Sequence, residues 1–466
     1  MSLTDALPAL DDLVARTAAE HHCPTIAWGV VADGRLAHTA GWGHLDDGRS
    51  PTADTVYRIA SMTKSFTAAA VLMLRDDGAL WLDDPIVQHA PELAPALPEG
   101  VGPIRLRHLL SMSSGLATDD AWADRHLDIS DDELDRALAG GVLLAGTPGA
   151  TYEYSNLGYG LIGRVVKRCT GRRVQDIISE RVLSPLGMNH TTWVQPDHDD
   201  WARPYEHRDG TAVPDGPPLG DGEIAPMGGL WTNLTDLATW MTWLDDANRA
   251  GSARPGSTDD VLSRSSRREL QQMHRYIGMV PSADRTVAAG YGFGLRVRDD
   301  PRIGLVVTHS GGVPGYGSSM RWLSGRGFGV AAMANITYAP MTELLQSMLD
   351  VLADHEALPP VEPVDPTIVE QVGRRLVDLL NDWDDRTADE LFTDNVALDD
   401  SYARRRASAE RWLEACGRFV VERVDVTRPT TGRLALTHPS GEPLWLDLDL
   451  APTRPLRVQW YELSLG

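Results

Sequence analysis

Residues 57–66 read YRIASMTKSF, and the spacing of Ser61 and Lys64 in this stretch decides how the whole chain is interpreted. The protein has 43 basic residues, of which only two, Lys64 and Lys167, are lysines. Where positive charge alone is needed, this composition supplies arginine. A lysine differs because it can lose its proton when it is desolvated. The position of Lys64 between apolar stretches therefore indicates proton chemistry.

The stretch from residue 61 to residue 74, SMTKSFTAAAVLML, is apolar nearly all round, which is typical of a helix buried inside a domain. On such a helix Ser61 and Lys64, at positions i and i+3, share one face. The helix would begin near Ser61, with its N–H groups and positive dipole end beside the hydroxyl. A buried lysine has a lowered pKa and can accept the serine proton. Taken alone, the S-x-x-K pattern is common and also occurs by coincidence.

Two later motifs add to it. TYEYSNLGYGLIG (151–163) places Tyr154 and Asn156 just ahead of an apolar helix, and VVTHSGGVPGYGS (306–318) places His309 and Gly311 at the end of an apolar strand. This trio, in this order, resembles the serine β-lactamase and penicillin-binding-protein superfamily, particularly its class C and esterase-like branch. The resemblance covers residues 8–356. It implies an α+β fold, with an antiparallel sheet flanked by helices and a helical subdomain.

The resemblance implies a role for each motif residue. Ser61 would be the nucleophile and would form an ester with the acyl group of the substrate. Lys64, with Tyr154, would take the serine proton and return a proton to the leaving group. Tyr154 suits this relay if Lys64 lowers its pKa. Asn156 would hold Lys64 and the substrate amide by hydrogen bonds.

The remaining site residues would bind rather than react. The N–H groups of Ser61 and Gly312 would form the oxyanion hole, and Gly311 would keep the strand clear for a substrate to pair along it. We expect Trp231 and Tyr316 to line the cleft, although simple packing would explain either of them equally well. No metal or other cofactor is implied.

His309 departs from the lactamase pattern. Where K-T-G offers a permanent cation for the carboxylate of a drug, a histidine is about neutral at pH 7. This argues against a dedicated β-lactamase. It favours esterases, D-stereospecific peptidases and acyl transferases, in which a histidine at the mouth of the site can orient or deprotonate the incoming nucleophile.

The composition and the N-terminal sequence restrict which binding partners and which cellular location we expect for the protein. A net charge of −23 makes nucleic acid and membrane surfaces unsuitable partners. The three cysteines, Cys23, Cys169 and Cys416, are far apart and odd in number, which indicates single thiols. The first 20 residues lack the basic region and apolar core of a signal peptide, and no run of 18 apolar residues follows. We therefore expect a cytoplasmic protein, unless a leader has been removed.

The chain is predicted to contain two domains. LPPVEPVDP (358–366) is a proline-rich linker between a domain at 1–357 and a smaller one at 367–466. In the first domain we expect helices near 3–21, 104–116, 170–188 and 342–355, a hairpin turning at Asp33-Gly34, an irregular segment at 195–226 and late strands from residue 303 onward. In the second, helices at 367–383 and 406–416 precede strands, giving an α+β module. A lipocalin-type barrel closure is the alternative for its sheet.

The function follows from these expectations. Cytoplasmic members with an added C-terminal domain include penicillin-binding-protein-type thioesterases, which release and macrocyclise nonribosomal peptides with a D-configured C-terminal residue, delivered on a peptidyl carrier protein. We predict this peptide cyclase. The alternative is a cytoplasmic esterase, or a D-stereospecific peptidase or amidase. A β-lactamase fits less well because of His309. A penicillin sensor that acylates and stops also fits less well, because such sensors need a membrane segment.

Overall fold

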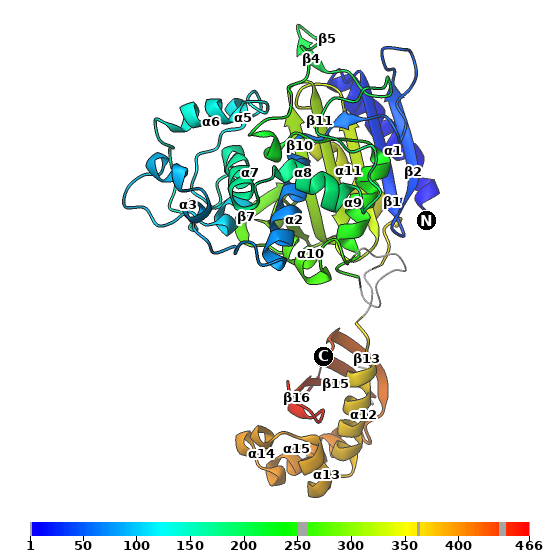
Figure 1. The fold of residues 1–466 in the computed structure, drawn as a ribbon. Coiled ribbons are helices and arrows are strands. Elements are labelled where there is room, and N and C mark those ends of the chain that lie inside the picture. The colour runs from blue at the N-terminus through cyan, green and yellow to red at the C-terminus, as the bar shows by residue number, and fades with distance from the viewer. Residues whose placement is uncertain (1, 250–258, 361–363, 438–443, 466) are drawn as a thin grey trace. The chain divides into compact units, whose positions relative to one another are not determined.

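The computed structural model of the protein describes residues 2–249, 259–360, 364–437 and 444–465. The chain divides into two compact units, Met1–Pro360 and Val361–Gly466, each drawn with its own sheet and helices in Figure 1. Each unit has its own apolar core.

The first unit is built on an eight-stranded sheet in the order β2-β1-β12-β11-β10-β9-β8-β7, with every neighbouring pair antiparallel. Because β1 pairs with β12, Ile26 lies opposite Ala334, and the sheet joins the two ends of this unit as predicted. The strands at residues 275–300 were not predicted. The strands are β1 (Thr25–Ala32), β2 (Arg35–Gly43), β7 (Arg275–Ser282), β8 (Arg285–Tyr291), β9 (Arg296–Asp300), β10 (Gly304–Val313), β11 (Tyr316–Leu323) and β12 (Phe328–Ala334).

The predicted hairpin is confirmed. β1 and β2 are joined at Asp33 and Gly34, whose φ angles of 50° and 67° are those of a turn with two left-handed residues. Asx-Gly turns favour this geometry because glycine has no Cβ to clash and aspartate tolerates the left-handed region.

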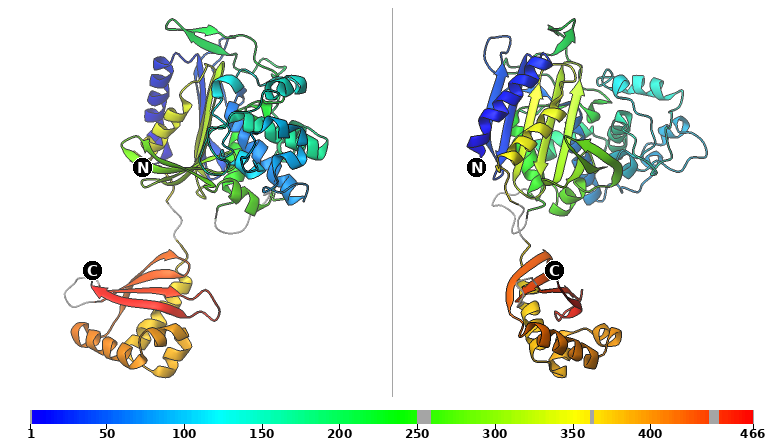
Figure 2. Two further views of the ribbon diagram at one scale, coloured as in Figure 1. Left: turned by 90° about the vertical axis from the view of Figure 1, so that its left-hand side faces the viewer. Right: turned by 180° about the vertical axis from the view of Figure 1, so that it is seen from behind.

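Helices cover both faces of this sheet (Figure 2). On one face α1 (Leu3–Glu20) packs against α11 (Met341–Asp354), and their apolar sides meet the sheet in one core. The other face is covered by α2 (Thr63–Asp76) and α9 (Leu234–Asp245), whose buried side chains belong to a second, larger core. The site lies on this second side, where α2 meets the sheet.

The helical subdomain extends from the second face. It contains α3 (Ile86–His89), α4 (Leu106–Leu110), α5 (Asp120–Ala123), α6 (Asp131–Leu138), α7 (Asn156–Thr170) and α8 (Val174–Ile178), which continues as a π-helical turn at Ser179–Leu183; α10 (Arg264–Leu270) lies outside it. The predicted helix at 104–116 is therefore shorter than expected, because the chain leaves the helix at Met112, whose φ is 52°. Within the irregular segment at 195–226, β4 (Tyr205–Arg208) pairs with β5 (Thr211–Pro214). Outside that segment, β3 (Tyr57–Arg58) pairs with β6 (Trp231–Thr232).

The second unit is α+β, as predicted. Its helices are α12 (Thr367–Asn381), α13 (Asp385–Leu391), α14 (Asp394–Asp399) and α15 (Tyr402–Cys416); its strands are β13 (Val421–Arg428), β14 (Thr431–Leu436), β15 (Leu444–Leu450) and β16 (Val458–Leu465). Along β15 every second residue is buried, as the alternating leucines predicted. Among the described residues the sheet is open, with β13 and β16 at its edges. The lipocalin-type closure is therefore not formed, because four strands do not complete a barrel.

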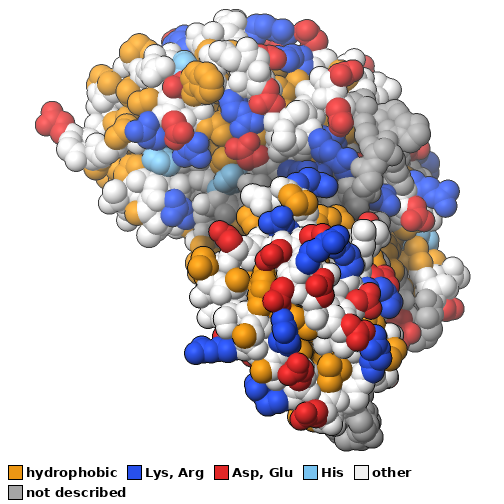
Figure 3. Space-filling view, turned by 90° about the horizontal axis from the view of Figure 1, so that it is seen from below, with side chains coloured by type: hydrophobic (Ala, Val, Ile, Leu, Met, Phe, Trp, Pro, Cys, Tyr) orange, Lys and Arg blue, Asp and Glu red, His pale blue; other side chains and the backbone are white. Residues whose placement is uncertain are grey.

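Charged side chains of both signs are interspersed over the face of the molecule shown in Figure 3. The second unit contains exposed ion pairs, such as Arg423 with Asp425 and Arg433 with Asp447. No helix in the described ranges combines the length and apolar character needed to cross a bilayer.

Candidate active site

Ser61 lies at a sharp bend between β3 and α2. Ala60, just before it, has a φ of 47°, a left-handed conformation that is unfavourable for a residue with a Cβ. A short 3-10 turn at Ala60–Met62 then leads into α2, which begins at Thr63. The bend places Ser61 at the start of the helix, as the motif predicted, with its side chain on the wall of a cavity.

Lys64 is fully buried and points at Ser61. Its Nζ lies 2.8 Å from Oγ of Ser61, 2.6 Å from Oδ1 of Asn156 and 2.9 Å from the carbonyl oxygen of Met227. Burial lowers the pKa of Lys64 from 10.5 to about 7, against the field of nearby aspartates led by Asp124, which favours the ammonium form. The amine form is therefore accessible near neutral pH, which an arginine could not provide.

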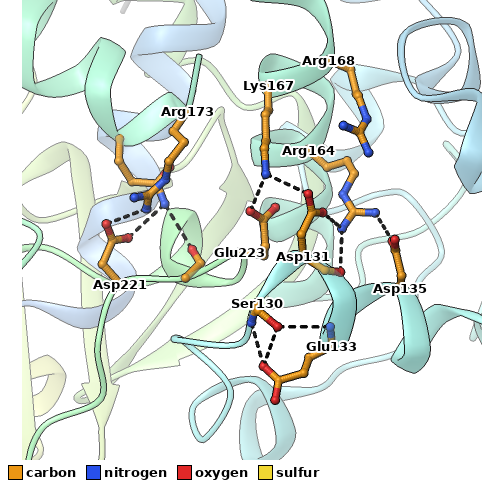
Figure 4. Close-up of polar contacts among 12 residues, drawn as sticks. Ser130, Asp131, Glu133, Asp135, Arg164, Lys167, Arg168, Arg173, Asp221 and Glu223 are labelled. Atoms are coloured by element: carbon orange, nitrogen blue, oxygen red, sulfur yellow. Dashed lines mark hydrogen bonds and ion pairs between the residues drawn. The ribbon is translucent and has the colours of Figure 1, made fainter. Parts of the chain in front are cut away.

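The other lysine has the opposite environment. Lys167 on α7 forms ion pairs with Asp131 and Glu223 (Figure 4). Partial burial lowers the pKa of Lys167, but its hydrogen bonds and ion pairs with these two carboxylates outweigh that effect and raise the pKa. In the same view Arg173 pairs with Asp221. These contacts hold the segment at 221–227 against α7 and α8. That segment ends at Met227, whose carbonyl accepts from Lys64, so the network positions one partner of the base.

Asn156 is the first residue of α7, and its backbone N–H is held by the carboxylate of Asp119 at 2.7 Å. Its side chain holds Lys64 through Oδ1, as expected. Its Nδ2 donates to Asp120 at 2.6 Å, and the residue has no exposed surface. Asp120 thus takes one of the two hydrogens of Nδ2, and the expectation that Asn156 also binds the substrate amide stays a prediction.

Tyr154 hydrogen-bonds to Ser61 through its side chain, and its ring centroid lies 5.0 Å from Nζ of Lys64. Burial raises its pKa well above 10, and this outweighs both the hydrogen bond to Ser61 and the field of Arg296. The condition set for the Tyr154 relay, a pKa lowered by Lys64, is therefore not met. Tyr154 is a neutral phenol that can donate a proton, while Lys64 is the group suited to accept one.

His309 lies in the wall of the cavity but is only 2% exposed, not at its mouth. Its Nδ1 donates to the carbonyl of Ser310 at 2.7 Å, and its Nε2 accepts from the hydroxyl of Tyr291 at 2.9 Å. Burial and the nearby cations Lys64 and Arg296 lower the pKa of His309 well below 6.5, so the ring is neutral. Because both ring nitrogens are engaged, His309 has no free nitrogen with which to deprotonate a nucleophile.

Tyr291, on β8, was not identified from the sequence. It is completely buried, and its ring also lies edge-on to that of Tyr154, with centroids 6.3 Å apart. No motif marks Tyr291, because its distance from His309 depends on how β8, β9 and β10 pair.

Gly311 lies where β10 passes the segment that carries Ser61. A Cβ on Gly311 would lie 2.2 Å from the carbonyl oxygen of Ile59 and 2.9 Å from Cβ of Ala60, so only glycine fits. Strand β9 pairs with β10 only as far as Thr308, opposite Arg296. Beyond that point, among the described residues, His309–Val313 pairs with β11 alone. One edge of this stretch is therefore open beside Ser61.

These residues surround a cavity of about 590 Å³. Its walls include Ser61, Tyr154, His309, Gly311 and Gly312, together with the charged side chains Asp120, Asp124, Glu153, Arg296 and Glu343.

Trp231 and Tyr316 do not line this cavity. Both are buried in the core, where their rings pack edge to face with centroids 5.5 Å apart, and the hydroxyl of Tyr316 donates to the carbonyl of Ala202. Trp231 and Tyr316 thus pack in the core and do not form the cleft lining that was expected of them. The cavity wall is mainly polar.

Comparisons with known proteins identify the family of the first unit. The family model described as Beta-lactamase matches residues 10–354. Esterase EstB of Burkholderia gladioli is 30% identical over 358 residues, which cover 67% of this chain and 86% of the esterase.

Solved structures extend the comparison. A penicillin-binding protein homologue from Pyrococcus abyssi, described as octameric, superposes with a TM-score of 0.63 at 21% identity, covering 99% of this chain and 100% of that one. A D-stereospecific amidohydrolase from Streptomyces sp. superposes with a TM-score of 0.57 at 23% identity, covering 74% of this chain and 97% of the other. These likenesses show a shared fold.

Proposed function

The chain belongs to the beta-lactamase family, and from that premise we propose that it is a serine hydrolase or acyl transferase that acts on esters and amides through an acyl-enzyme on Ser61. The observation that carries the proposal is the contact between Lys64 and Ser61, 2.8 Å apart, with the pKa of the buried lysine lowered to about 7. A serine needs such a neighbouring base to become a nucleophile.

Acylation can be written from these groups. The amine form of Lys64 takes the proton of Ser61 as Oγ bonds to the substrate carbonyl carbon, and the carbonyl oxygen becomes an oxyanion. The backbone N–H groups of Ser61 and Gly312 are the proposed donors to that oxygen. When the intermediate collapses, the bond to the leaving group breaks. Tyr154 donates its phenol proton to the leaving group, and Lys64 replaces that proton through the network around Ser61.

Deacylation reverses the proton path. A water or an amine attacks the ester carbonyl and gives a proton to the Lys64–Tyr154 pair, and Oγ of Ser61 leaves with a proton. His309 is not the base in this step, because its two nitrogens are already bonded to Ser310 and Tyr291. Its proposed role is to shape the wall behind the reacting carbonyl.

The names of the relatives support ester and amide substrates. The relative that is 30% identical is called an esterase, and one protein of the same fold is called a D-stereospecific amidohydrolase. Both reactions use the same acyl-enzyme, so one site can perform either.

The second candidate is the finer function predicted from the sequence, a penicillin-binding-protein-type thioesterase that cyclises a peptide delivered on a carrier protein. Two observations favour a peptide substrate: the open edge of β10 can pair with an extended chain, and a cavity of about 590 Å³ is in the range that encloses a ligand of several residues. Cyclisation also requires that water be excluded. The polar wall, without Trp231 or Tyr316, gives that requirement no support, so hydrolysis is the first candidate.

Two measurements test these proposals. A fluorophosphonate should label Ser61, as shown by peptide mass spectrometry, and Ser61→Ala should lose turnover of p-nitrophenyl acetate by about 10⁴-fold or more. Labelling of another serine would refute the acyl-enzyme assignment. A peptidyl thioester with a D-configured C-terminal residue and a free amine then separates the two candidates, because a hydrolase releases linear acid and a cyclase releases cyclic peptide.

A further inference from the structure

The cavity walls carry an unbalanced charge. Four carboxylates, those of Asp120, Asp124, Glu153 and Glu343, line the cavity, against the single guanidinium of Arg296. The buried carboxylate of Asp300, by contrast, faces Arg285. Within the described ranges none of the four cavity carboxylates forms an ion pair. Asp124 and Asp120 also act on the charge of Lys64 behind Ser61, and even with that lysine counted the carboxylates outnumber the cations.

The open edge of β10 has two distinguishable ends. Arg296 lies opposite Thr308, where the pairing with β9 stops. Four residues further along β10, Gly312 lies against the ring of Tyr338, because a Cβ on that glycine would be 2.7 Å from Cδ1 of the tyrosine. Four residues of a strand span about 13 Å. Arg296 and Tyr338 therefore mark opposite ends of the open edge, and Gly311, beside the Ser61 segment, lies nearer the Tyr338 end.

Tyr338 holds the carboxylate of Asp124 at the Gly312 end of the open edge. Its hydroxyl donates to Oδ2 of Asp124 at 2.9 Å. Asp124 is only 3% exposed yet belongs to the cavity wall. In the part of the chain that the structure describes, no group donates to its other oxygen, Oδ1. Tyr338 is held in a left-handed conformation, with a φ of 54°, which is unfavourable for an aromatic residue and typical of functional positions.

The proton donor shows which part of a substrate lies at each end. Tyr154, the group proposed to protonate the leaving group, has its ring centroid 5.7 Å from the guanidinium carbon of Arg296. We place the leaving group on the Arg296 side of Ser61, because its proton donor lies beside that arginine. The acyl part extends the other way along β10, toward Tyr338 and Asp124.

We propose that Asp124, held by Tyr338, binds an ammonium group on the acyl part of the substrate, close to the reacting carbonyl. Because Gly311 and Gly312 are neighbours, this ammonium lies within about two residues of the carbonyl, as the free α-amine of an aminoacyl or dipeptidyl donor does. Arg296 faces a leaving group that is neutral or carries a carboxylate. The inference rests on the proposed acyl-enzyme function and adds a substrate class to it.

The test compares two donors that differ only in charge: alanine benzyl ester, with a free amine, and N-acetylalanine benzyl ester, each as both enantiomers. Released benzyl alcohol gives kcat/KM. At pH 7.5 the better enantiomer of the free amine should exceed its acetylated form by about tenfold to a hundredfold, the factor that a buried charge-assisted hydrogen bond supports. Asp124→Asn should bring this ratio close to one, and Tyr338→Phe should lower it partly.

Glu343→Gln is the matched control, since it removes a cavity carboxylate from the first turn of α11, and it should leave the ratio as in the unaltered protein. A preference for acetylated donors, or a ratio that Asp124→Asn does not change, overturns the inference. So does cleavage of p-nitrophenyl acetate with no cleavage of the free-amine ester. If the unaltered protein cleaves none of the esters, the proposed function itself is refuted.

Discussion

Nζ of Lys64 and Oγ of Ser61 lie 2.8 Å apart, one helical turn from each other, in a position where the lysine has no exposed surface. This contact joins two requirements of acyl transfer: a nucleophile, and a base whose pKa is near neutral. It also explains why a chain with so many arginines keeps a lysine there, since an arginine would stay charged.

Replacing Lys64 by arginine should be nearly as damaging as replacing it by alanine. Arginine keeps the charge but cannot accept the serine proton, and its larger head does not fit between Asn156 and Met227. We expect both variants to lose about 10³-fold or more in kcat/KM on p-nitrophenyl acetate. Substantial activity in Lys64→Arg would show that the residue acts only by its charge.

The pH dependence should follow the same lysine. Burial lowers the pKa of Lys64 to about 7, and the active form is the amine, so activity should rise as pH increases through 7 and level off above it. The measurement is kcat/KM for a neutral ester from pH 5.5 to 9. A profile that falls over this range would require a base other than Lys64.

Tyr291→Phe should affect both stability and activity. It removes the donor to Nε2 of His309 and leaves a buried acceptor unpaired, which costs about 1–3 kcal/mol in the free energy of unfolding. Because the imidazole is then free to turn in the cavity wall, kcat/KM should also fall, by about tenfold.

Tyr316→Phe is the control for this change. It deprives the buried carbonyl of Ala202 of its donor and should cost similar stability, measured by urea denaturation. Tyr316 lies outside the cavity, so kcat/KM should stay as in the unaltered protein. If both variants lost activity equally, Tyr291 would have only a structural role.

Gly311→Ala should impair catalysis sharply. The added methyl group would meet the carbonyl oxygen of Ile59 at 2.2 Å, so β10 and the Ser61 segment must move apart. A displacement of about 1 Å at a reacting group can cost about 10²-fold in rate. Gly102→Ala, whose Cβ would meet no atom within 4 Å, should leave kcat/KM unchanged. Full activity in Gly311→Ala would contradict the close approach of the two segments.

Local features of the fold could be predicted from the sequence because they depend on neighbouring residues. The left-handed turn at Asp33-Gly34 and the buried alternation of β15 follow from residue type and a period of two. The strands at 275–300 were missed; β7 lies at the edge of the sheet, and because only its last residue, Ser282, is buried, no buried apolar run marks it.

The sequence by itself predicted that Ser61 and Lys64 meet, because residues three apart in a helical turn share a face, and the structure places them 2.8 Å apart. Only the tertiary structure decided how the other groups act. Asn156 lies 92 residues from Lys64 along the chain, and only the packed chain brings it to both Lys64 and Asp120. The neutral state of His309 depends on its burial and on the nearby charges of Lys64 and Arg296, and its Nε2 accepts from Tyr291, which lies on another strand. Burial sets these pKa values and contacts, and burial is a property of the packed chain that neighbouring residues in the sequence do not determine.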